Sequence, residues 1–455
     1  MKKYKDSRVN WIGEIPAHWE IIKVKNLALN NGSLFIDGDW IESDVIQETG
    51  IRYLTTGNIG AGKFKRQGNN YISEETFHSM NCLKALPGDL AISRLNEPIG
   101  RACILPYDEP RYVVAVDIVI LRPDSKYDKE YISYCMNTVG YSENASIMSR
   151  GTTMKRISRG GLGNFSIPIT SYSEQRLISN FLNKKTSEID TLISDKEKLI
   201  ALLEEKRQAI ITETVTKGLN PDVKMKDSGV EWIGEIPEHW GITKLGRVSD
   251  VIDPEPSHRA PAMAKEEGFP YIGIRDINPD GSINLETARR IEEPALIAQE
   301  NRFTINTKDI IFCRVATIGH PRVLKKETRI ALSATLALIQ YKPTKINYLY
   351  LLYYLNSLPV KIQSELFSTG STRRSLGMEV LRKFDVILPN YEEQIEIIDH
   401  LKKYITNTDI IIETERDLIS KLKEYRQALI YEAVTGKIDV QEMLKEIEQE
   451  EVSSS

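Results

Sequence analysis

Two basic clusters in the sequence have the composition of a nucleic-acid contact. The first runs from Arg150 to Arg156 and is followed by Arg159, and the second runs from Gly370 to Arg374. Both combine glycine, short hydroxyl side chains and cations, which suits contacts to phosphate oxygens or to base edges in a groove. Solvated loop charge is the alternative, but the clusters occupy equivalent places in an internal repeat, which favours DNA.

Single arginines outside these clusters could also meet DNA. Arg94 and Arg314 each follow an apolar, strand-like run, and each could reach a guanine edge or pair with a core carboxylate such as Asp89 or Asp309. The sequence leaves these two alternatives open. The residues that we predict to contact DNA are basic or carry short hydroxyl groups: Arg94, Arg101, Arg150, Thr152, Thr153, Lys155, Arg156, Arg275, Arg314, Arg322, Ser371, Thr372, Arg373 and Arg374.

The chain lacks a recognisable catalytic constellation. Gly57-x4-Gly62-Lys63 resembles a phosphate-binding loop, but Phe64 stands where a Mg²⁺-binding Ser or Thr should follow, so a glycine-rich turn is favoured. Gly160–Gly163 is no dinucleotide fingerprint. We find no Ser/His/Asp or Cys/His arrangement, no metal-ligand spacing and no NPPY-type methyltransferase motif. We therefore expect no catalytic residue, no metal and no cofactor in this chain.

The repeat explains the placement of two histidines. Asp6–Trp19 (DSRVNWIGEIPAHW) returns as Asp227–Trp240 (DSGVEWIGEIPEHW), and matching helical segments begin at Tyr172 and Tyr391. A period of about 221 residues in a chain of 455 means two copies of one domain-plus-helix unit. His18 and His239 therefore occupy equivalent P-x-H-W elements, which favours a structural, packing or partner-facing role over metal binding.

Two long helices with coiled-coil character are predicted, over residues 171–216 and 391–435. The expected seam of the first alternates in steps of four and three, and the second copy keeps it at +219. Its positions are Ile178, Leu182, Lys185, Ile189, Leu192, Lys196, Leu199, Leu203, Lys206 and Ile210. Each helix would be about 60 Å long. Pseudo-two-fold symmetry favours antiparallel pairing, with Lys196 opposite Glu415 near the middle of both seams.

The remaining sequence predicts two mixed α and β domains, at 1–170 and 227–390. Strand-like runs include Tyr112–Leu121, Asp309–Cys313 and Ala331–Gln340, bounded by Gly, Pro and Asp. Asn30–Pro87 and Asp250–Thr307 share little beyond YLTTGNI and YIGIRDI. The two copies thus keep a scaffold and differ where a ligand would be met. Residues 217–226 read as a linker, and the acidic tail 436–455 is expected to be disordered.

Composition limits the class of protein further. Four scattered cysteines form no CxxC pair, which fits a reducing compartment, and neither a signal peptide nor a membrane-length apolar run is evident, so we expect a cytoplasmic protein. A net charge of −4 argues mildly against a lone nucleic-acid binder. A partner is therefore expected to supply part of the electrostatic attraction to DNA.

The duplicated order of motifs resembles the specificity subunits of type I restriction–modification enzymes. The resemblance rests on W-I-G-E-I-P-x-H-W at Trp11 and Trp232, on Glu174-Gln175 and Glu393-Gln394 at the helix starts, and on the R-Q-A elements at Arg207 and Arg426. It covers residues 1–437, nearly the whole chain. Each motif is weak alone, but their repeated order is specific.

The resemblance implies a non-catalytic subunit with two target-recognition domains, α+β in class, joined by two long antiparallel helices. Each domain would read one half of a bipartite, asymmetric site in double-stranded DNA. Two adenine methyltransferase subunits using S-adenosylmethionine would dock on it, together with two restriction subunits using ATP and Mg²⁺. An enzyme is disfavoured by the missing motifs, while a coiled-coil scaffold that does not bind DNA remains the alternative.

Overall fold

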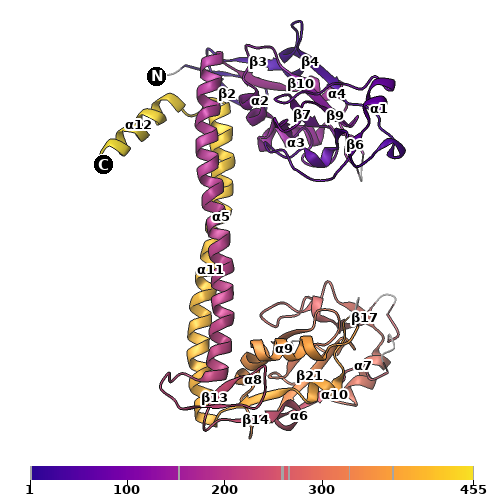
Figure 1. Cartoon of the computed structure of the whole chain (residues 1–455), viewed down its shortest axis with the longest axis vertical. Helices are drawn as coiled ribbons and strands as arrows, with labels where there is room; N and C mark the ends of the chain where they lie inside the picture. Colours follow the sequence, from indigo (N-terminus) through magenta and orange to yellow (C-terminus); the bar gives the residue numbers. More distant parts are fainter. Residues whose placement is uncertain are drawn as a thin grey trace. The chain divides into compact units, whose positions relative to one another are not determined.

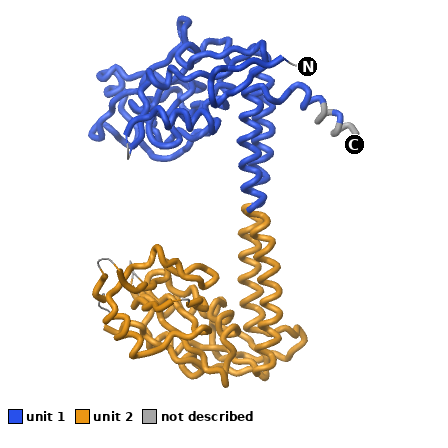
Figure 2. Tube along the Cα trace, turned by 180° about the vertical axis from the view of Figure 1, so that it is seen from behind, with its two compact units in different colours: residues 1–196, 417–455 blue, residues 197–416 orange. Residues whose placement is uncertain are grey.

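The computed structural model describes residues 3–151, 154–257, 261–264, 267–326, 328–370 and 374–453. The chain divides into two compact units, shown in Figure 2: unit 1 is Met1–Lys196 with Asp417–Ser455, and unit 2 is Glu197–Arg416. This division differs from the expected series of domains and separate helices. Each half of a long helix packs into the core of a unit, as Ile397 and Leu401 do in unit 2, so the helices are not independent segments.

Unit 1 is built on two main sheets. The four-stranded antiparallel sheet has the order β4-β10-β7-β8, and the three-stranded sheet β6-β5-β9 contains a parallel β5–β9 pair. The strands are β1 (Tyr4–Asp6), β2 (Glu14–Pro16), β3 (Glu20–Lys23), β4 (Leu34–Asp37), β5 (Ile51–Leu54), β6 (Tyr71–Ile72), β7 (Leu90–Ser93), β8 (Ala102–Ile104), β9 (Tyr112–Val114), β10 (Ile118–Arg122) and β11 (Ser166–Ile169). The helices are α1 (Glu74–Ser79), α2 (Lys129–Met136), α3 (Val139–Ile147) and α4 (Arg159–Gly163), with 3-10 turns η1 (Val24–Leu27), η2 (Ser43–Val45) and η3 (Thr56–Asn58).

Unit 2 repeats this topology. Its sheets have the orders β15-β21-β18-β19 and β17-β16-β20, again with a parallel pair, β16–β20. The strands are β12 (Met225–Asp227), β13 (Glu235–Pro237), β14 (Gly241–Lys244), β15 (Ser249–Ile252), β16 (Phe269–Ile272), β17 (Arg289–Ile291), β18 (Ile310–Cys313), β19 (Gly319–Val323), β20 (Ala331–Leu332), β21 (Leu336–Tyr341) and β22 (Asp385–Leu388). The helices are α6 (Leu245–Val248), α7 (Glu293–Glu300), α8 (Tyr348–Leu355), α9 (Leu358–Phe367) and α10 (Met378–Arg382), with η4 (Ile274–Asp276) (Figure 1). The predicted duplicated α+β class is confirmed.

Two predicted strands prove to be pairs of strands. Tyr112–Leu121 contains β9 and the start of β10, and Ala331–Gln340 contains β20 and most of β21. In each run the first strand joins the three-stranded sheet and the second joins the four-stranded sheet. The continuous apolar runs therefore connect two sheets, and both of their strands are buried.

The two long helices are α5 (Tyr172–Lys217) and α11 (Tyr391–Val434). In unit 1, Asp190 of α5 pairs with Arg426 of α11 at 2.9 Å, and in unit 2, Arg207 of α5 pairs with Asp409 of α11. Low-numbered α5 residues thus meet high-numbered α11 residues in one unit and the reverse holds in the other. The predicted antiparallel pairing is confirmed in each unit. Pairing of Lys196 with Glu415 stays a prediction.

The predicted seam is wrong at every second position. Leu182 and Ile189 are buried as expected, but Leu192 and Leu199 are 45% and 40% exposed, and Ile193 is 8% exposed instead. In α11, Ile412 and Ile419 are buried where Ile411 and Leu418 were expected. From Leu182 the observed seam steps by four residues to buried Thr186 and then by three to Ile189. Every second seam position therefore lies one residue later in the sequence than predicted. The phase of the seam is set by buried isoleucines and a threonine, and Leu192 and Leu199 lie on the exposed side.

The end of each long helix is held by a buried tyrosine of the unit that it enters. In unit 1, the Tyr131 hydroxyl donates to the carbonyl oxygens of Pro168 and Val434, both at 3.1 Å. In unit 2, the Tyr350 hydroxyl donates to Ile387 and Val215 in the same way. Beyond α11, Gly436 has φ +70° and lies so close to Pro16 that an added Cβ would be 2.5 Å from its Cδ. The C-terminal part of the chain therefore completes unit 1.

The expectation of a disordered tail is wrong, because Val440–Ser453 form helix α12. Val440 is 4% exposed and anchors the start of this helix. Its sequence repeats apolar residues every three or four positions, a spacing that outweighs the acidic composition on which the expectation rested.

The corrected seam can be tested with two neighbouring residues of α5. Ile193→Ala should lower the free energy of unfolding by about 2 kcal/mol because it leaves a cavity between the helices. Leu192→Ala is the matched control and should change it by less than about 0.5 kcal/mol. Urea unfolding followed by circular dichroism measures both; equal effects would contradict the corrected phase.

Candidate nucleic-acid interface

A duplicated polar cluster fixes the start of each long helix. In unit 1, Glu174 accepts hydrogen bonds from the Trp19 indole at 3.2 Å and from the His18 ring at 3.1 Å. In unit 2, Glu393 accepts from Trp240 at 3.1 Å and from His239 at 2.8 Å. These contacts join the P-x-H-W elements to the helices and, of the structural, packing or partner-facing roles expected for the two histidines, favour the structural one.

The glutamines next to these glutamates are buried and duplicated as well. The side-chain oxygen of Gln175 accepts from the Asp128 backbone N–H at 2.9 Å, and that of Gln394 accepts from the Asn347 N–H at 2.8 Å. Both Asp128 and Asn347 are N-caps, of α2 and α8 respectively. The Glu-Gln pairs thus connect each long helix to the P-x-H-W element and to a neighbouring helix of the same unit.

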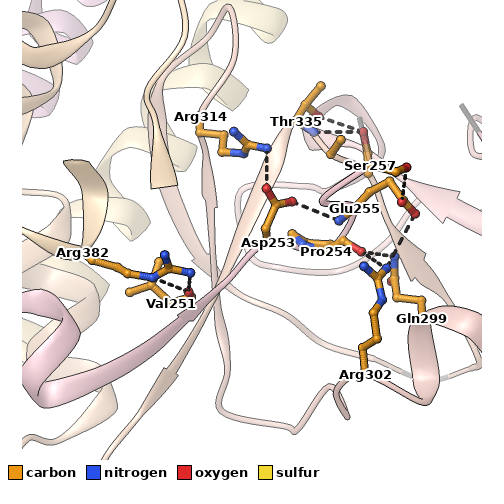
Figure 3. A network of polar contacts seen from close by, with 12 residues as sticks. Val251, Asp253, Pro254, Glu255, Ser257, Gln299, Arg302, Arg314, Thr335 and Arg382 are labelled. Atoms are coloured by element: carbon orange, nitrogen blue, oxygen red, sulfur yellow. Dashed lines mark hydrogen bonds and ion pairs between the residues drawn. The ribbon is translucent and has the colours of Figure 1, made fainter. Parts of the chain in front are cut away.

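Arg94 and Arg314 are buried and pair with partly buried carboxylates. Arg94 lies 3.0 Å from Asp37 and 3.8 Å from Asp117, and its side chain is 6% exposed. Burial lowers the pKa of Arg94, and the charge of Asp37 opposes this shift. Arg314 is 7% exposed and lies 3.0 Å from Asp253, at the end of β15 (Figure 3). Of the two alternatives, the structure favours the carboxylate pair.

The partners named from sequence were wrong. Asp89 binds Arg122 at 2.7 Å, and Asp309 accepts from the Gln340 amide at 2.6 Å. Burial raises the pKa of Asp309, and hydrogen bonds from Asn306 and Gln340 oppose this shift. The true partners, Asp37 and Asp253, lie in segments with little sequence similarity, so the repeat did not reveal them.

Two further candidate arginines hold loops together. Arg101 is 9% exposed and donates to the carbonyl oxygens of Ile59 at 2.7 Å and Thr56 at 2.9 Å, as well as to three carbonyls of its own loop. Arg322 donates to the carbonyl oxygen of Ile277, the counterpart of Ile59. Burial lowers the pKa of both arginines. Like Arg94 and Arg314, they are bound by protein acceptors in this structure.

The exposed candidates gather on one duplicated hairpin. Arg150 forms a bridge with Arg156, and Thr369 forms the same bridge with Ser375; each hairpin also pairs with the loop after the third strand of the main sheet, through Leu95 or Val315. Arg150, Arg156 and Arg374 are exposed, and Lys155 is half-exposed. Thr152, Thr153, Ser371, Thr372 and Arg373 lie outside the described residues.

Several of these cations are partly neutralised. Lys155 lies 3.0 Å from Glu97, and Arg156 lies 2.7 Å from Asp117. Arg275, in η4, is exposed. The structure therefore brings Arg150, Lys155 and Arg156 together at the surface of unit 1 and places Arg374 at the equivalent place in unit 2.

The glycine-rich turn has a use that the sequence did not suggest. Lys63 lies 2.6 Å from Asp190 of α5, which also binds Arg426. Although burial raises the pKa of Asp190, the hydrogen bond from Lys63 and the charge of Arg426 outweigh it and lower that pKa. Sequence reasoning used Arg207 and Arg426 only as motif residues. Their partners Asp190 and Asp409 also recur at +219, and this signal could have revealed both pairs.

The described residues offer neither a metal site nor a membrane-spanning helix. Across the described ranges, no three His, Cys, Asp or Glu side chains gather so that they could hold a metal ion. Nor does any described helix combine the length and apolarity that crossing a bilayer requires. The molecule is thus a duplicated α+β scaffold that presents basic hairpins from two folds.

The chain belongs to the family described as the type I restriction modification DNA specificity domain. That family matches twice, at residues 16–202 and 237–421. The chain is 24% identical over 444 residues to a Methanocaldococcus jannaschii protein provisionally assigned as the type I restriction enzyme MjaX specificity subunit, covering 94% of this chain and 96% of that one. It is 23% identical over 323 residues to the type I restriction enzyme EcoBI specificity subunit of Escherichia coli, covering 70% and 67%.

A solved structure has the same fold. A chain from a type I R-M system, described for its complex assembly and conformational transition, aligns with a TM-score of 0.69 at 15% identity, covering 93% of this chain and 99% of that one. At this identity the likeness concerns the fold alone. It agrees with the duplicated α+β architecture described above.

Removing Arg314 tests whether the buried arginines stabilise the fold. Arg314→Ala should lower the free energy of unfolding by about 3 kcal/mol because it removes the buried guanidinium that pairs with Asp253. Arg275→Ala, at an exposed position, should change it by less than about 0.5 kcal/mol. Thermal unfolding of the two variants measures the difference, and a neutral Arg314→Ala would show that the pair is not needed for folding.

Proposed function

We propose that this chain is the non-catalytic DNA-reading subunit of a type I restriction–modification complex and reads a bipartite, asymmetric site. The observation that carries the proposal is the recurrence of one fold with different loops. Unit 1 presents Arg150 and Arg156 on its hairpin, while unit 2 presents Arg374 on the equivalent hairpin. Equivalent surfaces with different side chains suit two different half-sites in double-stranded DNA.

The modification subunits are the expected source of chemistry. Adenine methylation would use S-adenosylmethionine bound by those partners, and restriction subunits, where present, would use ATP and Mg²⁺. Family membership and the lack of a catalytic motif in the sequence support this division of labour. This chain would hold no cofactor of its own.

Exposed apolar residues on the long helices support docking of two similar partners. Leu192 and Leu418 are 45% and 37% exposed in unit 1, and Leu199 and Ile411 are 40% and 47% exposed in unit 2. These positions recur at +219, so each unit offers the same kind of surface. Duplicated surfaces in one chain fit two copies of one modification subunit.

The remaining alternative is a coiled-coil scaffold that does not bind DNA. The seam and the exposed apolar positions would suit that role equally well. The scaffold reading leaves unexplained why the hairpins differ in charged side chains while the buried Arg–Asp pairs recur. Affinity for duplex DNA that falls steeply with rising salt separates the two, since only phosphate contacts release counterions.

Mapping methylated adenines tests the proposal directly. Co-expression of this chain with an adenine modification subunit of its own system should produce N6-methyladenine in a single split, asymmetric motif. Expression of the modification subunit alone is the control and should produce none. A soluble complex of both proteins without any motif would instead support the scaffold alternative.

The length of the helices should set the unread spacer of the site. Deletion of one heptad from each of α5 and α11, chosen to keep the buried stripe in phase, should shorten the spacer and leave both half-sites unchanged. Each heptad contributes about 10 Å of helix, about three base pairs of duplex. Methylome mapping of the variant measures this, with circular dichroism as the control for helix content. An unchanged spacer would refute the proposal that helix length sets the spacer.

A further inference from the structure

Unit 2 contains a cavity with an excess of cations that adjoins its DNA-reading hairpin at Arg374. It has a volume of about 450 Å³ and lies between the β18–β19 loop, α9 and Arg374. Its lining includes Ala316, His320, Lys361, Glu365 and Arg374. The cavity also has apolar walls, and the charged groups that line it are mixed in sign, with cations in excess.

Backbone hydrogen bonds show which part of unit 1 corresponds to this cavity. The Asn96 N–H donates to the Lys155 carbonyl at 3.1 Å, and the Ala316 N–H donates to the Arg374 carbonyl at 2.8 Å. Asn96 and Ala316 also share a left-handed conformation, with φ of +60° and +64°. Lys155 and Arg374 are therefore equivalent residues, each beside the same turn.

In unit 1 a carboxylate of the chain itself occupies this place. Glu97 follows Asn96, and its Oε1 lies 3.0 Å from the Lys155 ammonium and 2.5 Å from the Ser146 hydroxyl. The hydrogen bond from Ser146, followed by that from Lys155, lowers the pKa of Glu97. Glu97 is therefore ionised near neutral pH and acts as a built-in anion.

Unit 2 lacks that carboxylate. Thr317 follows Ala316 where Glu97 follows Asn96, and Lys361 of α9 replaces Ser142 of α3 as an additional cation. Burial, together with the charges of Arg322 and Lys361, lowers the pKa of His320, so the imidazole is neutral near pH 7. The excess positive charge of the cavity thus comes from Lys361 and Arg374.

One carboxylate does line the cavity, but it does not replace Glu97. Glu365 of α9 stands where Ser146 stands in unit 1. Among the residues that the structure describes, neither Arg374 nor Lys361 forms an ion pair with it, whereas Lys155 is paired. Two cations without a paired carboxylate in a concave site attract an anion from outside.

We propose that this cavity binds a phosphate group, supplied by the DNA backbone, at the position that Glu97 fills in unit 1. The assignment of DNA as the source rests on the proposed function. Only unit 2 then makes a phosphate contact at this place, because in unit 1 the equivalent cation, Lys155, is already paired with Glu97. Glu97 is an internal substitute for phosphate, and the difference adds one backbone contact to one half-site.

The salt dependence of DNA binding tests this contact. We would measure affinity for a random-sequence duplex at several salt concentrations, using the full chain in complex with its modification subunits. Arg374→Gln should reduce the slope of log K against log salt by about 0.9, the value for one phosphate contact. Glu97→Gln should steepen the slope by a similar amount, because it frees Lys155. Lys345→Gln, which removes an exposed cation whose ammonium donates to the Arg247 carbonyl, is the control and should leave the slope unchanged.

Binding of inorganic phosphate distinguishes the two possible sources of the anion. The ³¹P signal of inorganic phosphate should broaden with the wild-type protein and not with Arg374→Gln. Loss of broadening with an unchanged salt slope would identify a free phosphate ion as the ligand and overturn the DNA assignment. No effect of Arg374→Gln in either measurement would overturn the anion site. If the wild-type complex failed to bind duplex DNA, the proposed function would fail, and the phosphate signal would still decide whether the cavity binds an anion.

Discussion

The antiparallel pairing of α5 with α11 is the constraint on which the other contacts depend. It brings the end of α11 to the first strands of unit 1, where Tyr131 binds the Val434 carbonyl and Gly436 packs on Pro16. It also brings Asp190 to Arg426 within that unit. Parallel helices would leave both the helix end and the charged pair without partners. The seam charges therefore fix the same register that the closure of unit 1 requires.

The buried arginines show how one scaffold can carry different loops. Arg94 with Asp37, and Arg314 with Asp253, connect the first and third strands of the main sheet by the same pair in both units. The residues that must stay fixed for folding are thus separate from those exposed on the hairpins. Side chains at the hairpin surface can change without loss of the core ion pair.

Much of the architecture could be predicted from sequence because the repeat reports equivalence directly. The long helices, their direction and the role of His18 follow from duplicated motifs. The phase of the seam could not be read from hydrophobicity, because the polar Thr186 is buried in it while the apolar Leu192 is exposed. The strand break within Tyr112–Leu121 was hidden because both of its strands are buried. The partners of Arg94 were missed because they come from strands distant in sequence, and a single sequence contains no signal for such a contact.

The segmental make-up of the two units has a consequence for how the protein folds during synthesis. Unit 2 is a continuous stretch, Glu197–Arg416, so its core can close once that stretch has left the ribosome. Unit 1 also needs Asp417–Ser455, so it cannot close until the segment after unit 2 has been made. The second domain in the sequence is thus the first that can reach its final state, and a nascent chain exposes an incomplete N-terminal domain until the segment after unit 2 has emerged.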